Sequence, residues 1–110
     1  MAEIRMTYNG IEALQPGMEM DVRVACDVMG GSYVDSCEMY SRSLEDAFEV
    51  AKKFLPRVTL NYLTSDDGYP VGWHCCLGDR YGQLYQAHGC STPAEAICKA
   101  ALMVAHRAVR

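Results

Sequence analysis

The apolar pattern is clearest near the end of the chain, in the segment CSTPAEAICKAALMVAHRAV. Ile97 and Ala101 belong to a series of apolar residues at helical spacing, which predicts a helix. Thr92 is expected to be the N-cap, Pro93 the first helical residue and Glu95 the returning partner of a capping box. The alanines of this segment are small, so the helix is expected to lie close to a sheet.

A second helix is predicted for the segment SLEDAFEVAKKFLP, whose apolar positions also repeat at helical spacing. Ser41 or Ser43 is available as its N-cap, and Pro56 ends it. Acidic residues precede Lys52 and Lys53, an order that suits the helix dipole and the pairing of residues four positions apart.

The segment PGMEMDVRVACDVMGG fits two different elements. Strict alternation of apolar residues from Met18 to Val28 favours a half-buried strand. A helix would also gather apolar residues on one face, with Gly17 near its start and Gly30 at its end. The pattern by itself leans to a strand over residues 17–29 and leaves both elements open.

Two strand-like runs, WHCCL and LYQAH, flank the turn sequence GDRYGQ and predict a hairpin. Arg80, Tyr81 and Gly82 are expected to form a three-residue loop, with Gly82 in the left-handed conformation. In that register residue 77 pairs with 85, 75 with 87 and 74 with 88. One face is then apolar and the other polar, and a slip of one residue would invert them. A further strand is predicted in RVTLNYLTS from its β-branched content.

The polar face of this hairpin carries the residues that come nearest to a metal site. His74 and His88 are expected to be cross-strand neighbours, with Cys76 next to them and Cys90 within possible reach. Imidazoles and thiolates suit zinc, but the chain lacks the Cys-x-x-Cys pairs that structural zinc sites usually use. We therefore predict no metal and no other cofactor, with a metal-supported enzyme or regulator on this face as an alternative.

Composition indicates one globular domain over residues 1–110, with a core at about 13–108, because 50% of the 110 residues are hydrophobic and 22% are charged. The first residues, MAEIRMTYNG, lack the apolar run of a signal peptide, and no segment reaches the ~18 apolar residues that span a bilayer. We expect a cytoplasmic protein that does not enter membranes, and six reduced cysteines.

The formal net charge is −4, and the ten Lys and Arg residues are scattered except for Lys52, Lys53 and Arg57. Acidic residues directly precede this small cluster, so general binding of nucleic acid is not expected. The sequence holds no nucleophile–base pair with an orienting acid and no glycine-rich phosphate loop, so an enzyme is not expected either.

With metal binding and catalysis not expected, ligand binding is the remaining function. It is supported by arginines and tyrosines that lie together on predicted turns and loops. An arginine beside aromatic residues can hold a phosphate and stack on a base. The candidate ligand-binding residues are Tyr40, Arg42, Tyr69, Arg80 and Tyr81. They predict a site for a small anionic ligand, although the same residues could simply rest their apolar sides on the core.

The order of these segments resembles the phage α/β/α (ABA) sandwich domain family, over about residues 13–105. The resemblance rests on PGMEMDVRVACDVMG, YSRSLEDAFEVAKKF, a strand containing tryptophan and STPAEAICKAALMV. It implies that residues 17–29 form a helix. The implied fold is α+β, with the order α-α-β-β-β-α and three helices that flank a small three-stranded antiparallel sheet, Arg57–Leu63, Gly72–Gly78 and Gln83–His88.

The resemblance also implies a phage-encoded accessory protein. Small acidic phage proteins without catalytic motifs often act by binding, for instance as counter-defence proteins that block a host immune protein or sequester a nucleotide signal. A structural or assembly role in the virion is a further alternative. Because a three-stranded sheet has open edges that must be covered or paired, we also expect a homo-oligomer, most simply a dimer.

Overall fold

Residues 6–30, 38–64 and 71–108 are described by the computed structural model, and they form helices and one antiparallel sheet. Their elements, in chain order, are α1 (Tyr8–Ala13), α2 (Met18–Asp27), α3 (Leu44–Ala51), the 3-10 helix η1 (Lys52–Phe54), β1 (Val58–Leu63), β2 (Gly72–Gly78), β3 (Leu84–Cys90) and α4 (Pro93–His106). The α+β fold class and the order of elements predicted from the sequence are confirmed, with the short α1 as an addition that the sequence analysis missed.

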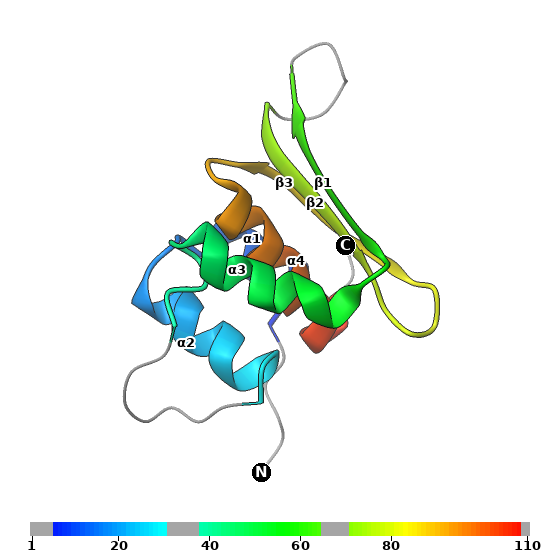
Figure 1. Ribbon diagram of the computed structural model, residues 1–110, viewed down its shortest axis with the longest axis horizontal. Coiled ribbons are helices and arrows are strands. Elements are labelled where there is room, and N and C mark those ends of the chain that lie inside the picture. Colours follow the sequence, from blue (N-terminus) through cyan, green and yellow to red (C-terminus); the bar gives the residue numbers. More distant parts are fainter. Residues whose placement is uncertain (1–5, 31–37, 65–70, 109–110) are drawn as a thin grey trace.

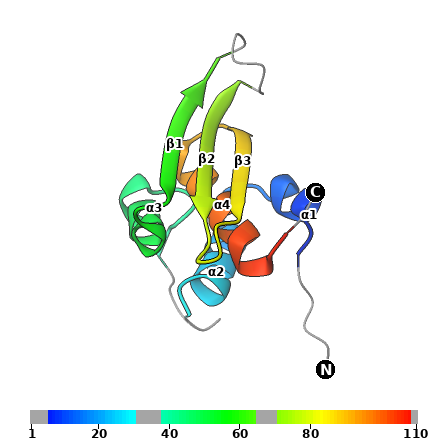
Figure 2. The same cartoon turned by 90° about the vertical axis from the view of Figure 1, so that its right-hand side faces the viewer.

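The sheet has the order β1-β2-β3, and the helices lie on one side of it (Figure 1). Helix α4 packs directly on all three strands and also contacts α1, α2 and α3. Helix α4 therefore lies against the sheet, with α3 beside it and α2 farther from the strands. Figure 2 shows the other face of the sheet toward the viewer, with no helix of the described residues in front of it.

Residues 18–27 form a helix, as the family resemblance implies, so the strand favoured by their alternating pattern is wrong. Met20, Val24 and Ala25 are buried on the face that turns toward the other helices. Residues four positions apart, such as Met20 and Val24, share one face both in a strand and in a helix. Packing against α4 decides in favour of the helix. Gly17 precedes this helix and Gly30 follows it.

The N-terminal caps follow the sequence signals. The side chain of Ser43, and not that of Ser41, accepts the N–H of Asp46 and caps α3. Thr92 accepts the N–H of Glu95 at 3.1 Å and caps α4, with Pro93 as the first helical residue. The Glu95 carboxylate returns to the N–H and hydroxyl of residue 91, and not to the N–H of the cap itself.

The hairpin has the predicted register in its central part, where Leu77 pairs with Tyr85 and Cys75 with Ala87. The three-residue loop is also confirmed, because the Asp79 N–H donates to the carbonyl oxygen of residue 83 and Gly82 has a φ of 87°. Toward the far end a bulge shifts the register, and β3 extends to residue 90, past its predicted end.

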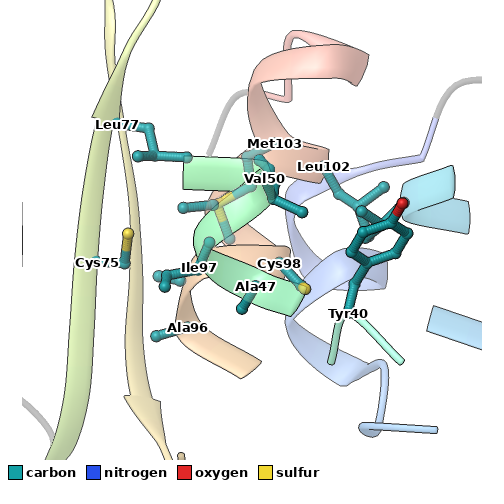
Figure 3. Packing of buried hydrophobic residues seen from close by; sticks show 14 of the residues in the cluster. Tyr40, Ala47, Val50, Cys75, Leu77, Ala96, Ile97, Cys98, Leu102 and Met103 are labelled. Atoms are coloured by element: carbon teal, nitrogen blue, oxygen red, sulfur yellow. The ribbon is translucent and has the colours of Figure 1, made fainter. Parts of the chain in front are cut away.

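The core lies on both sides of α4, as Figure 3 shows. Cys75 and Leu77 project from β2 toward the side of α4 that carries Ile97. Leu102 and Tyr40 lie on the opposite side of the same helix. Small and medium side chains fill both interfaces, so the helix approaches its neighbours closely.

A buried carboxylate fixes the segment before α3. Asp21 is fully buried, and its Oδ1 accepts the N–H of Ser41 at 2.7 Å and the Ser41 hydroxyl at 2.5 Å. Its Oδ2 accepts two hydrogen bonds from the Arg42 guanidinium, at 2.7 and 3.1 Å. The Ser41 hydroxyl oxygen also accepts the N–H of Gly17. This network joins the start of α2 to the start of α3.

We predict that Asp21→Ala lowers the free energy of unfolding by about 1–3 kcal/mol, because it leaves the buried Ser41 N–H without its acceptor. Glu49→Ala is the matched control, since it also removes an ion-paired carboxylate, but one whose partner Lys52 is 63% exposed. That change should cost less than about 1 kcal/mol. Urea unfolding decides, and equal midpoints for the two variants would contradict the assignment of the network.

Three cysteines, Cys75, Cys90 and Cys98, are buried members of the core. Burial raises the pKa of the Cys75 thiol to about 12, with neighbouring Cys76 and Cys90 adding to the shift. Burial likewise raises the pKa of Cys90 to about 12 and that of Cys98 well above its ordinary value. These thiols are protonated at neutral pH and therefore weak nucleophiles.

Alkylation of the folded protein at pH 8 is predicted to modify Cys26 and Cys76, which are half-buried, well before the three core thiols. After unfolding in denaturant without reductant, all six cysteines should react, as expected for reduced thiols. Time-resolved mass spectrometry of peptides measures both steps. Fast labelling of Cys98 in the native state, or fewer than six adducts after unfolding, would refute this prediction.

Candidate functional site

A pocket of about 350 Å³ opens where three segments of the chain meet. One wall comes from η1 and the turn that follows it, another from the hairpin loop, and the third from the end of α4. The lining residues are Lys53, Phe54, Arg57, Gly78, Asp79, Arg80, Tyr81, Val104, Ala105 and Arg107. Its volume lies in the range of small-molecule sites, about 300–1,000 Å³.

The pocket is strongly basic although the chain is acidic. It contains four of the ten Lys and Arg residues of the chain and one carboxylate, while the net charge of the whole chain is −4. The four cations are Lys53, Arg57, Arg80 and Arg107, and none of them is in an ion pair with another described residue. Like charges at close range repel, so an anion in this pocket would relieve their repulsion.

Arg57 reaches the pocket across the end of β2 because Gly78 has no side chain. A Cβ at Gly78 would lie 3.0 Å from Cδ and 3.1 Å from Cβ of Arg57. The backbone of Arg57 is fixed as well, since its carbonyl oxygen accepts the N–H of Gly78 and its own N–H donates to the carbonyl oxygen of Phe54. The guanidinium is thus carried by a rigid part of the chain.

The hairpin wall is held by Asp79. Its Oδ1 accepts the N–H of Tyr81 at 2.8 Å and the N–H of Gln83 at 2.9 Å. The loop therefore presents Tyr81 outward with 75% of its surface exposed, and the Arg80 guanidinium lies 5.9 Å from the centre of the Tyr81 ring. Behind the loop, burial raises the pKa of the Tyr85 hydroxyl, and the Asp79 carboxylate raises it further.

The third wall is the end of α4, where Arg107 has a left-handed backbone conformation. Arg107 has φ 50° and ψ 45°, and its N–H donates back to the last turn of the helix. A non-glycine residue in this region is uncommon and carries some strain. Carbonyl oxygens at the end of a helix carry a partial negative charge, which favours cations there and offsets part of the repulsion within the pocket.

Of the five candidate ligand-binding residues, the structure brings Arg80 and Tyr81 together in the pocket. Tyr40 is buried in the core and Arg42 is paired with Asp21, so neither is among the lining residues. Tyr69 lies outside the described residues. Sequence reasoning missed Lys53, Arg57 and Arg107, although Lys53 and Arg57 belong to the only local cluster of basic residues that the sequence showed.

The polar hairpin face gathers only part of the candidate metal ligands. The rings of His74 and His88 are stacked with centroids 4.7 Å apart, and His74 Nε2 is 3.0 Å from the side-chain oxygen of Gln86. Cys90 is buried at the bulge, on the core side of the sheet, so the expectation that it could join this face is wrong. Within the described ranges, no group of three or more His, Cys, Asp or Glu residues is arranged to hold a metal ion.

Helices in the described part of the chain are too short or too polar to cross a membrane.

No curated protein matches the sequence. A solved structure of a phage protein from Bacillus cereus ATCC 14579 has a similar fold, with a TM-score of 0.61 and 18% sequence identity. The similarity covers 100% of this chain and 97% of that one. The model of the phage ABA sandwich domain matches residues 16–102, so the chain belongs to the phage ABA sandwich domain family.

Proposed function

We propose that this phage protein acts by binding a small anionic ligand in the basic pocket and does not turn it over. The single observation that supports this most strongly is the concentration of Lys53, Arg57, Arg80 and Arg107 around one concave site in an acidic chain. The only carboxylate among the lining residues, Asp79, is engaged by two backbone N–H groups. The pocket thus offers donors and positive charge and holds no candidate for a nucleophile activated by a base.

The expected affinity depends on how rigid the walls are. A micromolar dissociation constant corresponds to about 8 kcal/mol, and hydrogen bonds to charged groups contribute about 1.5–3 kcal/mol each. Three or four such bonds suffice only if little ordering is needed on binding. The backbone hydrogen bonds at Arg57, Tyr81 and Arg107 supply that order in advance.

Two modes of counter-defence were expected, capture of a small ligand and obstruction of a host protein. The chemistry of the pocket fits capture of a ligand better. A concave basic site matches a compact anion, whereas blocking a protein requires a broad contact surface of about 800 Å² on each partner. We therefore propose sequestration as the mode of action of this accessory protein, within the host cell. Among the described residues, no comparable feature favours a virion component or a metal-supported enzyme.

The pocket predicts a sharp difference between two adjacent lysines. Lys53 lines the pocket, while Lys52 pairs with Glu49 at 2.6 Å and is not among the lining residues. Isothermal titration with inorganic triphosphate should show binding weakened about tenfold in Lys53→Gln and in Arg57→Gln, because each loses one charged contact. Lys52→Gln changes the net charge equally and should bind like the parent protein.

Equal weakening by Lys52→Gln and Lys53→Gln would indicate a nonspecific effect of charge and would contradict the pocket as the site. No binding of triphosphate to the parent protein would count against the proposed function itself. Phosphorus NMR of the recovered ligand tests the absence of turnover. Release of inorganic phosphate in proportion to the protein present would identify an enzyme.

We also propose that the protein is a homo-oligomer that associates through its sheet. Strands β1 and β3 are both edges of the three-stranded sheet. Each edge carries an exposed apolar residue, Tyr62 on β1 and Leu84 on β3, both 55% exposed. Open edges and apolar side chains beside them are features that proteins usually cover.

Light scattering coupled to gel filtration is predicted to give the mass of a dimer or a larger assembly at tens of micromolar protein. Tyr62→Glu should shift the mass toward the monomer if β1 is the edge in contact, and Leu84→Glu if it is β3, because a charge opposes burial in either interface. A parent protein of monomer mass at this concentration would refute self-association without affecting the ligand-binding proposal.

A further inference from the structure

We infer that the anionic ligand is a nucleotide, with its base stacked on Tyr81 and its phosphates held by Lys53, Arg57 and Arg107. This inference rests on the proposed function and names the chemistry of its ligand. It comes from the unequal distribution of aromatic surface and charge over the three walls of the pocket.

Tyr81 is the most exposed large hydrophobic residue among the described ones, at 75%. The ring is nevertheless presented by an ordered loop, because Asp79 accepts the Tyr81 N–H at 2.8 Å and Gly82 allows the tight turn behind it. An aromatic side chain held outward at the rim of a pocket has a face available for a flat ligand. Stacking of a base on such a side chain is a recurrent mode of nucleotide recognition.

Arg80 adds positive charge beside the Tyr81 ring and leaves one face of the ring uncovered. Its guanidinium lies 5.9 Å from the centre of the Tyr81 ring, a distance at which a cation is attracted to the ring face. A guanidinium on one face leaves the opposite face of the same ring for a base.

The other two walls carry the remaining positive charge. Lys53 comes from η1 and Arg57 from the turn that follows it, and Arg107 comes from the end of α4. Phe54, Val104 and Ala105 lie among these cations and provide apolar surface. A ligand that uses all three walls therefore needs a flat aromatic group at one end and several negative charges at the other. A nucleoside diphosphate or triphosphate has both.

A nucleic-acid strand fits less well, because the charge available to it ends at the pocket. Outside the pocket, most described basic residues are already paired. Arg42 pairs with Asp21, Lys52 with Glu49, and Lys99 with Glu95. A strand needs a continuous path of free cations along its backbone, whereas a single nucleotide needs only one cluster.

The test compares ligands that share the triphosphate group and differ in the base. ATP, GTP, CTP and UTP are each titrated against the parent protein by calorimetry, with inorganic triphosphate as the reference. We expect at least one of the four nucleotides to bind about tenfold more tightly than inorganic triphosphate, because stacking adds to the charged contacts. Tyr81→Ala should abolish that advantage and leave triphosphate binding unchanged. Tyr81→Phe, which keeps the ring, should retain the advantage.

The outcomes separate the two proposals. Triphosphate that binds as tightly as every nucleotide, with no effect of Tyr81→Ala, would overturn the nucleotide inference and leave anion binding in place. Absence of binding for all five compounds would overturn both. Oligonucleotides of increasing length give a further arm, in which affinity that grows with length would identify a strand binder and overturn the inference.

Discussion

The burial of α4 is the constraint on which the rest of the structure depends. This helix packs against all three strands and the other three α-helices of the described chain, so it has almost no face toward solvent. A helix in that position needs apolar residues on every side and a partner for each charge it buries. Lys99 therefore pairs with Glu95 at 2.8 Å and donates to the carbonyl oxygen of Glu12, while His106 lies between Asp27 and the N–H of Met6. These contacts fasten the N-terminal segments to the centre of the fold.

Features encoded by neighbouring residues could be predicted from the sequence. The cap at Thr92 and the loop at Gly82 each depend on a few adjacent positions, and both are where the pattern placed them. Residues 18–27 could not be assigned from their pattern, because alternation and helical spacing coincide there and only the family resemblance separated them. Arg42 was predicted to bind a ligand because it lies beside a loop with a tyrosine close by in the sequence. Its actual partner, Asp21, is 21 residues away, and such a contact leaves no local signal.

The pocket was only partly predictable for the same reason. Its hairpin wall could be found because turn residues, arginine and tyrosine are adjacent in sequence. Arg107, by contrast, meets that wall only after the last helix has packed on the sheet. An acidic composition also hides a basic site. The average charge of the chain predicts no general nucleic-acid surface. It does not tell how the free cations are distributed once Arg42, Lys52 and Lys99 are paired.

The construction of the pocket from three distant segments has a consequence for the stability of the whole molecule. Its walls exist together only when the sheet, η1 and the end of α4 are all in place, so partly unfolded states lack the site. A ligand that binds only the native state stabilises it by mass action, in proportion to the logarithm of its concentration. Because α4 joins every layer, that stabilisation would extend through the sheet and the helices behind it. Occupancy of a surface pocket would then slow hydrogen exchange of backbone amides in the deep core, and the protein would resist proteolysis best when loaded.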